Sequence, residues 1–194
     1  MDRDERQLRS VVTKFETREA DDGAMHISGY FAVFNSNYEI ASGMSESIAP
    51  GAFSRTLGEN PDVRALINHD TTLVLGRTKA GTLKLHQDEI GLFGDIEVNR
   101  NDQDALNLYE RVKRGDVDQC SFGFAIRSEN TDVLPDGSVH WTITDVDLFE
   151  VSACTFPAYQ ATSISAREAQ RDEIKRRSLE AWKEKMKGVL KHGT

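Results

Sequence analysis

A serine and a histidine in two separate segments are the residues of this chain best suited to nucleophilic chemistry. Ser121 lies within 120–126 (CSFGFAI), where the even positions are apolar and the odd positions hold small residues. Because strand side chains alternate between two faces, this pattern predicts a strand with a small, open face around the hydroxyl. Gly123 on that face would allow the backbone of a substrate to approach closely. Ser121 is therefore a candidate nucleophile that needs a nearby base.

Five histidines could supply that base. His69 lies in the run 66–70 (LINHD), where an apolar strand gives way to a polar loop, and functional groups often occupy such positions. The others lie in alternating strand patterns, at a strand start or near the end of the chain: His26, His86, His140 and His192. His69 is the candidate general base.

A third group would hold the imidazole in its useful tautomer. Glu150 is flanked by apolar residues in 148–151 (LFEV), so we expect it to be partly buried and to need a partner. Asp70 is a rival because it adjoins His69, whereas Asp145 and Asp147 better suit an exposed edge.

Other chemistries lack their motifs. The chain has no CxxC, no HExxH, no phosphate-cradling glycine loop and no Gly-x-Ser-x-Gly elbow, which argues against a metal centre, a nucleotide site and an α/β-hydrolase. No cofactor is expected. No apolar run approaches the ~20 residues of a membrane span. The N-terminus lacks the apolar stretch of a signal peptide, so we expect a cytoplasmic protein with its two cysteines reduced.

Charge divides the chain in two. The overall net charge is -8, but residues 166–194 carry nine Lys/Arg against five Asp/Glu, which leaves a strongly acidic body. Because phosphate neutralisation needs a basic face, the acidic body argues against general nucleic-acid binding.

The predicted elements are mostly strands. Period-two patterns and turn residues predict strands at 10–17, 27–34, 63–68, 73–78, 82–87, 91–98, 119–127 and 140–156. Helical spacing and end signals predict helices at 50–57, 101–115 and 166–190, the last with a narrow apolar stripe. The fold class is mainly β with helices (α+β). We expect an N-terminal arm over 1–12, a body over 13–165 and a charged helical tail over 166–194.

Six segments follow one another along the chain: 29–35 (GYFAVFN), 46–53 (ESIAPGAF), 66–70 (LINHD), 92–96 (LFGDI), 120–124 (CSFGF) and 149–152 (FEVS) with Pro157. Together they resemble the caudovirus prohead serine protease family. Any one of them is weak, but their order and spacing agree with the family over roughly 13–165.

The resemblance implies a serine endopeptidase. It makes Ser121 the nucleophile and His69 the base, with Glu150 as third member and His140 as an alternative, because the related assemblins use a second histidine there. It also implies a compact assemblin-like β-barrel flanked by short helices. The implied substrates are the major capsid protein with its scaffold segment and the chain itself, inside the assembling prohead in the host cytoplasm. Assemblins gain activity by dimerising, so a homo-oligomer is also expected.

Three other functions are open on the sequence. The main alternative is a catalytically inactive scaffold or capsid-interaction module of the same fold; the presence of both Ser121 and His69 counts against it. A hydrolase of another substrate, such as an ester, is the second, and a virion nucleic-acid binder is the third.

Overall fold

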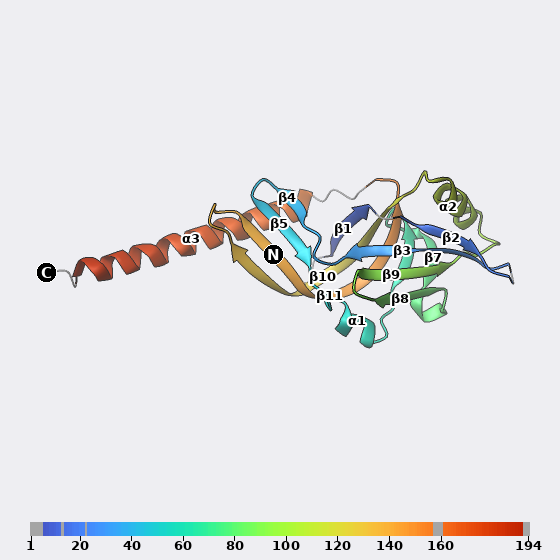
Figure 1. The fold of residues 1–194 in the computed structure, drawn as a ribbon, viewed down its shortest axis with the longest axis horizontal. Coiled ribbons are helices and arrows are strands. Elements are labelled where there is room, and N and C mark those ends of the chain that lie inside the picture. Colours follow the sequence, from blue (N-terminus) through green and yellow to red (C-terminus); the bar gives the residue numbers. More distant parts are fainter. Residues whose placement is uncertain (1–5, 13, 22, 157–160, 192–194) are drawn as a thin grey trace.

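The protein folds into two β-sheets with short helices and one long C-terminal helix (Figure 1). The structure is a computed structural model that describes residues 6–12, 14–21, 23–156 and 161–191. Pro157 of the sixth family segment and His192 lie outside the described residues.

The larger sheet is built around two long strands that form a hairpin. Its order is β1-β10-β11-β5-β4, and β6 joins it by pairing with both β11 and β7. The first part of β11 pairs with β5 and its last part with β6, both parallel. The strands are β1 (Gln7–Val12), β4 (Tyr38–Ala41), β5 (Met44–Ile48), β6 (Arg64–Ile67), β7 (Asp70–Arg77), β10 (Gln119–Val133) and β11 (Val139–Cys154).

The smaller sheet has the order β2-β3-β9-β8, and all its neighbouring strands are antiparallel. It comprises β2 (Glu16–Glu19), β3 (Met25–Val33), β8 (Leu83–Gln87) and β9 (Gly91–Glu97). Both sheets contribute to one apolar core, whose fully buried members include Ile27, Phe31, Ile96, Phe124 and Ile143.

The predicted α+β class is confirmed, but the expected barrel is not found. In the part of the chain that the structure describes, the strands form two sheets that end at different edge strands, so the hydrogen bonding does not close. Near its N-terminus the chain passes from the larger sheet to the smaller one. The single strand expected at 10–17 is two strands, because β1 ends at Val12 in one sheet and β2 begins at Glu16 in the other.

Short helices lie where end signals predicted them. Helix α2 (Gln103–Arg114) begins after Asp102, whose side chain accepts from the backbone N of Asp104 at 2.9 Å, and ends at Gly115 in the left-handed conformation with φ +87°. Helix α1 (Ser54–Gly58) is shorter than predicted. The 3₁₀ helix η1 (Thr78–Ala80) connects β7 to β8, which do not form a hairpin because they lie in different sheets. The hairpin of β4 and β5 was not predicted.

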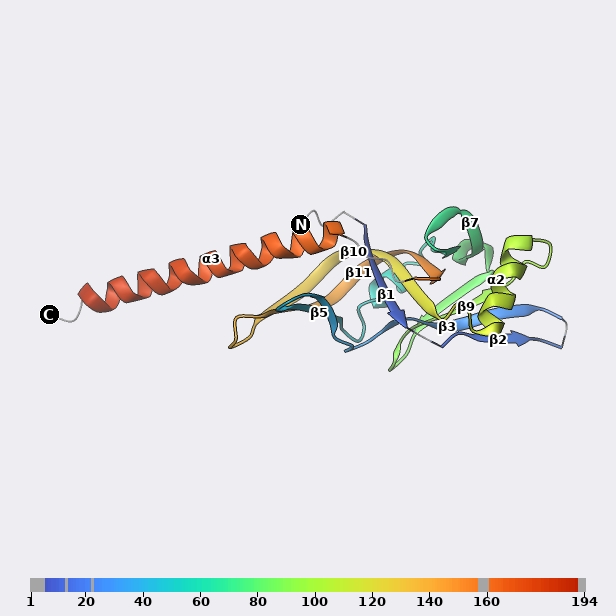
Figure 2. The same ribbon diagram turned by 90° about the horizontal axis from the view of Figure 1, so that it is seen from above.

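The C-terminal helix α3 (Ala161–Lys191) is fixed to the body at its start and projects from it beyond (Figures 1 and 2). Arg167 is fully buried and pairs with Glu46 at 3.0 Å and with Glu129 at 2.8 Å, while its guanidinium lies 4.6 Å from the centre of the Trp141 ring. Breaking such a buried ion pair by removing one partner typically costs about 3–5 kcal/mol. Arg167 therefore ties the helix firmly to the larger sheet.

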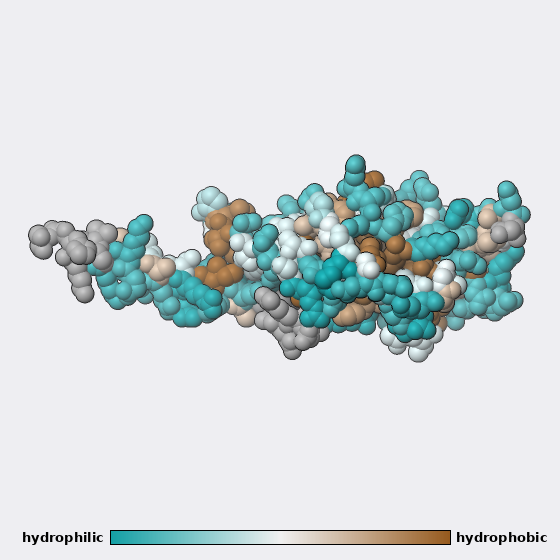
Figure 3. Space-filling model, turned by 90° about the horizontal axis from the view of Figure 1, so that it is seen from below, coloured by the Kyte–Doolittle hydropathy of each residue, from teal (hydrophilic) through white to brown (hydrophobic). Residues whose placement is uncertain are grey.

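The far part of α3 is solvent-exposed. Every side chain from 175 to 187 is exposed, and the helix surface there is mostly hydrophilic (Figure 3). Leu179, Trp182 and Met186 are exposed on it despite their apolar character. No helix among the described residues is both long and apolar enough to cross a membrane.

Candidate active site

His69 and Glu150 are hydrogen-bonded to each other on one face of the larger sheet. His69 Nδ1 lies 2.7 Å from Glu150 Oε1. Because an ionised carboxylate only accepts hydrogen bonds, Nδ1 carries a hydrogen, and in the neutral imidazole Nε2 then keeps its lone pair. Glu150 is only 3% exposed, and the His69 side chain is mostly buried. A histidine hydrogen-bonded to a buried carboxylate is the pairing that the base and its orienting group make in a hydrolytic triad.

A β-bulge places Glu150 on this face. Gly123 of β10 pairs with Glu150, but the next residue, Phe124, pairs with Leu148, so Phe149 is the extra residue of β11. A bulge resets the alternation of side chains along its strand and is common beside active sites. Phe149 is exposed, while Glu150 points to the protected side.

The turn between β6 and β7 holds the imidazole in place. Asn68 and His69 both have left-handed backbones, with φ +50° and +62°, which is costly for residues other than glycine. Asn68 anchors this turn to the end of β11: its backbone N donates to the Ala153 carbonyl at 2.9 Å, and its Oδ1 accepts from Thr155 N at 2.9 Å. The strained turn is thus fixed against the strand that carries Glu150.

Ser121 lies on the same face, one strand away. It pairs directly with Ser152 of β11, two positions along the ladder from the Gly123–Glu150 pair. Directly opposed residues have Cβ atoms about 4.5–5.5 Å apart and share a face. Ser121 is fully buried, and its Oγ donates a hydrogen bond of 2.8 Å to the carbonyl of Arg9 in β1. The structure brings His69 and Glu150 into contact and places the serine beside them, with its hydroxyl turned to β1.

In this structure Gly123 makes room for the Glu150 carboxylate and the Arg6 guanidinium. A Cβ at this position would lie 2.6 Å from Glu150 Oε1 and 2.8 Å from Nε of Arg6. Both distances are below van der Waals contact. The absence of a side chain at Gly123 therefore lets Glu150 and Arg6 lie across the strand.

The partners of Glu150 keep it ionised. Burial alone raises the pKa of this carboxyl, but the hydrogen bond and charge of His69 and the hydrogen bonds of Ser152 and Arg6 hold its pKa below the ordinary value. Ser152 Oγ donates to Oε2 at 2.6 Å, and Arg6 Nη2 donates to Oε1 at 2.8 Å. A charged carboxylate in this place can stabilise a protonated imidazole.

Cys154 is a second potential nucleophile near the histidine. Its Sγ lies 3.7 Å from His69 Nε2. Burial and the neighbouring Glu150 raise the pKa of this thiol to about 12, so it stays protonated at neutral pH. Because only a thiolate reacts readily, Cys154 acts as an apolar neighbour of His69.

Replacing Cys154 with alanine should therefore leave any cleavage that depends on His69 within about a few-fold of wild type and cost about 1 kcal/mol of stability for the small cavity. Initial rates of cleavage and thermal unfolding would measure both effects. A loss of cleavage as deep as that of His69→Ala would instead identify Cys154 as the nucleophile.

The rival carboxylates and histidine have other partners. Asp70 accepts from the backbone and hydroxyl of Thr72 at 2.8 and 2.6 Å. His140 lies between the hydroxyls of Ser45 and Ser47, at 2.8 and 2.9 Å from them, and sits ten positions along β11 from Glu150. At 3.3 Å per residue, that separation is about 30 Å. Asp145 and Asp147 pair with Arg55 at the surface.

Three neighbours of the site were missed in the sequence: Arg6, Ser152 and Cys154. The last two could have been found, because Glu150, Ser152 and Cys154 alternate along one strand and must share a face. Arg6 gave no such signal, since its place depends on the pairing of β1 with β10. Among the described residues, no cluster of His, Cys, Asp or Glu could hold a metal ion.

Fold and site together define a mixed α+β protein with a buried histidine–carboxylate pair beside a strand serine. The chain belongs to the caudovirus prohead serine protease family, whose sequence profile matches residues 13–177. It is 28% identical over 179 residues to the prohead protease of Enterobacteria phage HK97, covering 91% of this chain and 75% of that protein. Its fold is similar to that of the bacteriophage T4 capsid assembly protease gp21, with a TM-score of 0.55, 10% identity and coverage of 79% of this chain and 98% of the other.

Proposed function

We propose that this chain is a serine endopeptidase that cleaves the major capsid protein in its scaffold segment, and itself, during prohead maturation. Ser121 is the nucleophile, His69 the general base and Glu150 the group that orients His69. The observation that carries the proposal is the His69 Nδ1–Glu150 Oε1 hydrogen bond on the sheet face that also holds Ser121.

The reaction proceeds through an acyl-enzyme. The Ser121 hydroxyl rotates from the Arg9 carbonyl toward the imidazole, and its Oγ attacks the scissile carbonyl carbon while His69 Nε2 takes the proton. That proton passes to the leaving amine as the C–N bond breaks. Water then attacks the Ser121 ester with His69 again as base, which releases the acid and restores the hydroxyl. Backbone amides stabilise the oxyanion in both steps.

Co-expression with the major capsid protein of the same phage tests this role. Wild type should yield a shortened capsid protein and a shortened protease by intact mass, and Ser121→Ala should yield both chains uncut with proheads still assembled. Capsid protein left uncut by wild type and variant alike would favour the inactive scaffold or capsid-interaction module. An ester hydrolase would instead show small-ester turnover without capsid cleavage.

The exposed part of α3 is proposed to place the enzyme on an acidic scaffold helix within the prohead before it is cut away. Residues 178–194 carry four lysines and two glutamates, lie beyond the segment matched by the family and exclude the buried Arg167. A positive helix with a narrow apolar stripe suits a partner helix of opposite charge.

Deleting residues 178–194 is expected to leave cleavage of purified capsid protein unchanged and to lower incorporation into proheads by about tenfold or more, the effect of about 1.4 kcal/mol of lost binding. Quantifying protease per purified prohead would measure it in a Ser121→Ala background. A full-length variant tests the apolar stripe separately: Leu179→Ala/Trp182→Ala/Met186→Ala should lose incorporation too. Normal incorporation of the truncated chain would rule out this role of the helix.

A further inference from the structure

The nucleophile of the proposed protease is inaccessible in this structure. Ser121 is 0% exposed, and a peptide cannot reach its Oγ unless something moves. The covering element is β1: Ser10 lies directly opposite Ser121, and the Arg9 carbonyl accepts the Ser121 hydrogen bond. This cover matters only if Ser121 is the nucleophile, so the role of β1 rests on the proposed function.

Strand β1 is an edge strand laid along β10. It pairs antiparallel with Gln119–Phe124 from Gln7 to Val12 and forms the end of the larger sheet (Figure 2). An edge strand can leave without breaking the pairing of the strands inside the sheet. Its departure would expose the backbone of β10 beside Ser121, and an exposed strand edge binds extended peptides by adding them as a new strand.

The same segment also contacts the third member of the site. The Arg6 guanidinium, just before β1, binds Glu150 Oε1, the oxygen that also bonds His69. It therefore competes for the carboxylate that orients the base. Residues 6–10 therefore contact both Ser121 and Glu150.

The inner face of β1 is poorly suited to permanent packing. Two of its inward residues, Gln7 and Arg9, are polar and buried, and Gln7 Oε1 has no hydrogen-bond partner among the described residues. Burying a polar atom without a partner costs free energy, so β1 contributes less stability than an apolar strand would. The family match begins at residue 13, after β1 ends.

We propose that β1 occupies the substrate-binding edge of β10 as a built-in substrate mimic, and that the capsid segment binds there by replacing it. The bound segment is an extended peptide, antiparallel to 119–124, with its scissile carbonyl in the place of the Arg9 carbonyl. The full chain is held inactive until β1 leaves.

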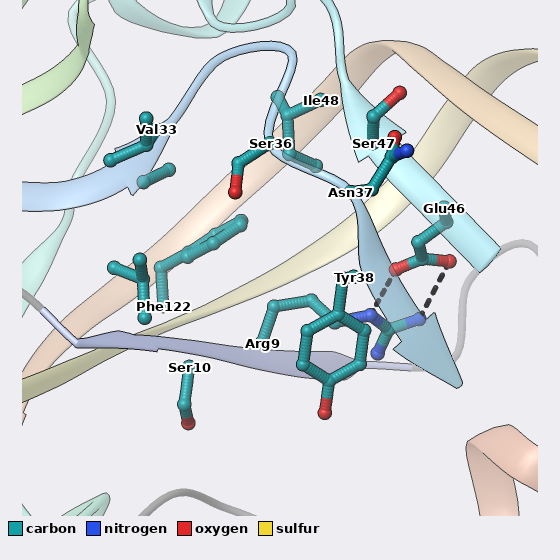
Figure 4. A pocket seen from close by; sticks show the side chains of 12 residues that line it. Arg9, Ser10, Val33, Ser36, Asn37, Tyr38, Glu46, Ser47, Ile48 and Phe122 are labelled. Atoms are coloured by element: carbon teal, nitrogen blue, oxygen red, sulfur yellow. Dashed lines mark hydrogen bonds and ion pairs between the residues drawn. The ribbon is translucent and has the colours of Figure 1, made fainter. Parts of the chain in front are cut away.

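The surroundings of Arg9 also indicate which charge the substrate residue in its place should carry. Its side chain enters a cavity of about 80 Å³ and pairs with the buried carboxylate of Glu46, whereas Ser10 points to the other side of β1 (Figure 4). Burial raises the pKa of Glu46, but the charges and hydrogen bonds of Arg9 and Arg167 hold it below the ordinary value. A substrate with lysine or arginine at the cleaved position restores the partner that Glu46 loses when β1 departs.

A reversible disulfide between β1 and β10 in the full chain tests whether β1 must leave the edge of β10 before cleavage. Val12 lies opposite Gln119 at the end of the β1–β10 ladder and is 73% exposed. Opposed residues of a ladder have Cα separations of about 4.5–5.5 Å, within the range of a disulfide. The native Cys120 and Cys154 are buried and stay protonated, so they should not compete. The variant is Val12→Cys/Gln119→Cys, and Val12→Cys alone is its control.

The substrate for this test is uncut capsid protein purified from the Ser121→Ala co-expression. We expect the oxidised double variant to cleave it at least about tenfold more slowly than the reduced form, with no redox effect in the control. In the unlocked chain, Arg6→Gln should speed cleavage a few-fold, because β1 loses a contact while Glu150 keeps His69 and Ser152. Equal cleavage by the oxidised and reduced forms would overturn the role of β1 and leave the protease function intact. Failure of both forms and of wild type would overturn the protease function itself.

The cleavage site tests the charge requirement separately. Fragment masses from wild-type cleavage identify the residue whose carbonyl is cut. A lysine or arginine there supports the pairing with Glu46, and an acidic or apolar residue contradicts it.

Discussion

Replacing Ser121 with alanine is expected to lower the rate of capsid-peptide cleavage by about 10⁴–10⁶-fold, since the loss of a triad nucleophile removes the covalent path altogether. The folded state should change little. The variant loses one hydrogen bond, from Oγ to the Arg9 carbonyl, which is worth about 1 kcal/mol. Single-turnover cleavage with purified protein, beside thermal unfolding, would measure both quantities.

Ser152→Ala is the matched control for that experiment. Ser152 is as buried as Ser121, pairs with it across the two strands and donates to Glu150 Oε2. Its removal loosens one contact of the orienting carboxylate, and we expect a loss of about tenfold, the lower end of the range for supporting hydrogen bonds. A deeper loss in Ser152→Ala than in Ser121→Ala would assign the nucleophile to Ser152.

Replacing Glu150 with glutamine is expected to lower kcat by about 10²–10⁴-fold, because an amide no longer fixes the tautomer of His69 or balances a protonated imidazole. The buried site retains its shape, so most of the effect should fall on kcat and little on KM. Steady-state kinetics on a cleavable capsid peptide would separate the two. Activity near wild type would mean that His69 does not depend on this carboxylate.

Lowering the pH should destabilise the fold of wild type more than that of Glu150→Gln. The folded-state pKa of Glu150 lies below its ordinary value of 4.5, so the ionised carboxylate stabilises the fold above that pH and the contribution is lost as pH falls through the lowered folded value. The difference in Tm between wild type and Glu150→Gln should therefore be largest near neutrality and shrink in acid. A difference that grows in acid would mean that the pKa is raised.

Local patterns predicted most of the fold. The alternation around Ser121 and the end signals of α2 depend on neighbouring residues, and the structure has a strand and a helix there. Whether the sheets close into a barrel depends instead on which distant strands pair, and local sequence patterns do not predict that pairing. The expected barrel and the expected single strand at 10–17 were wrong for this reason.

The candidate site was predicted in its residue types and only partly in its arrangement. Glu150 was expected to be buried with a partner because of its apolar neighbours, and the structure places His69 on it at 2.7 Å. The bulge at Phe149, which directs Glu150 to that face, depends on the register of β10 against β11. The covering of Ser121 by β1 depends on a pairing over more than a hundred residues, so an apparently polar arm at the N-terminus gave no sign of it.

The most direct measurement is peptide mapping after reaction with a fluorophosphonate, which forms a stable adduct with an activated serine. Reduced Val12→Cys/Gln119→Cys protein, Arg6→Gln and wild type would be compared with His69→Ala. We expect an adduct on Ser121 that is lost in His69→Ala. An adduct on Ser152 or Cys154, or cleavage-competent protein that carries none, would contradict the assignment of Ser121 as the nucleophile.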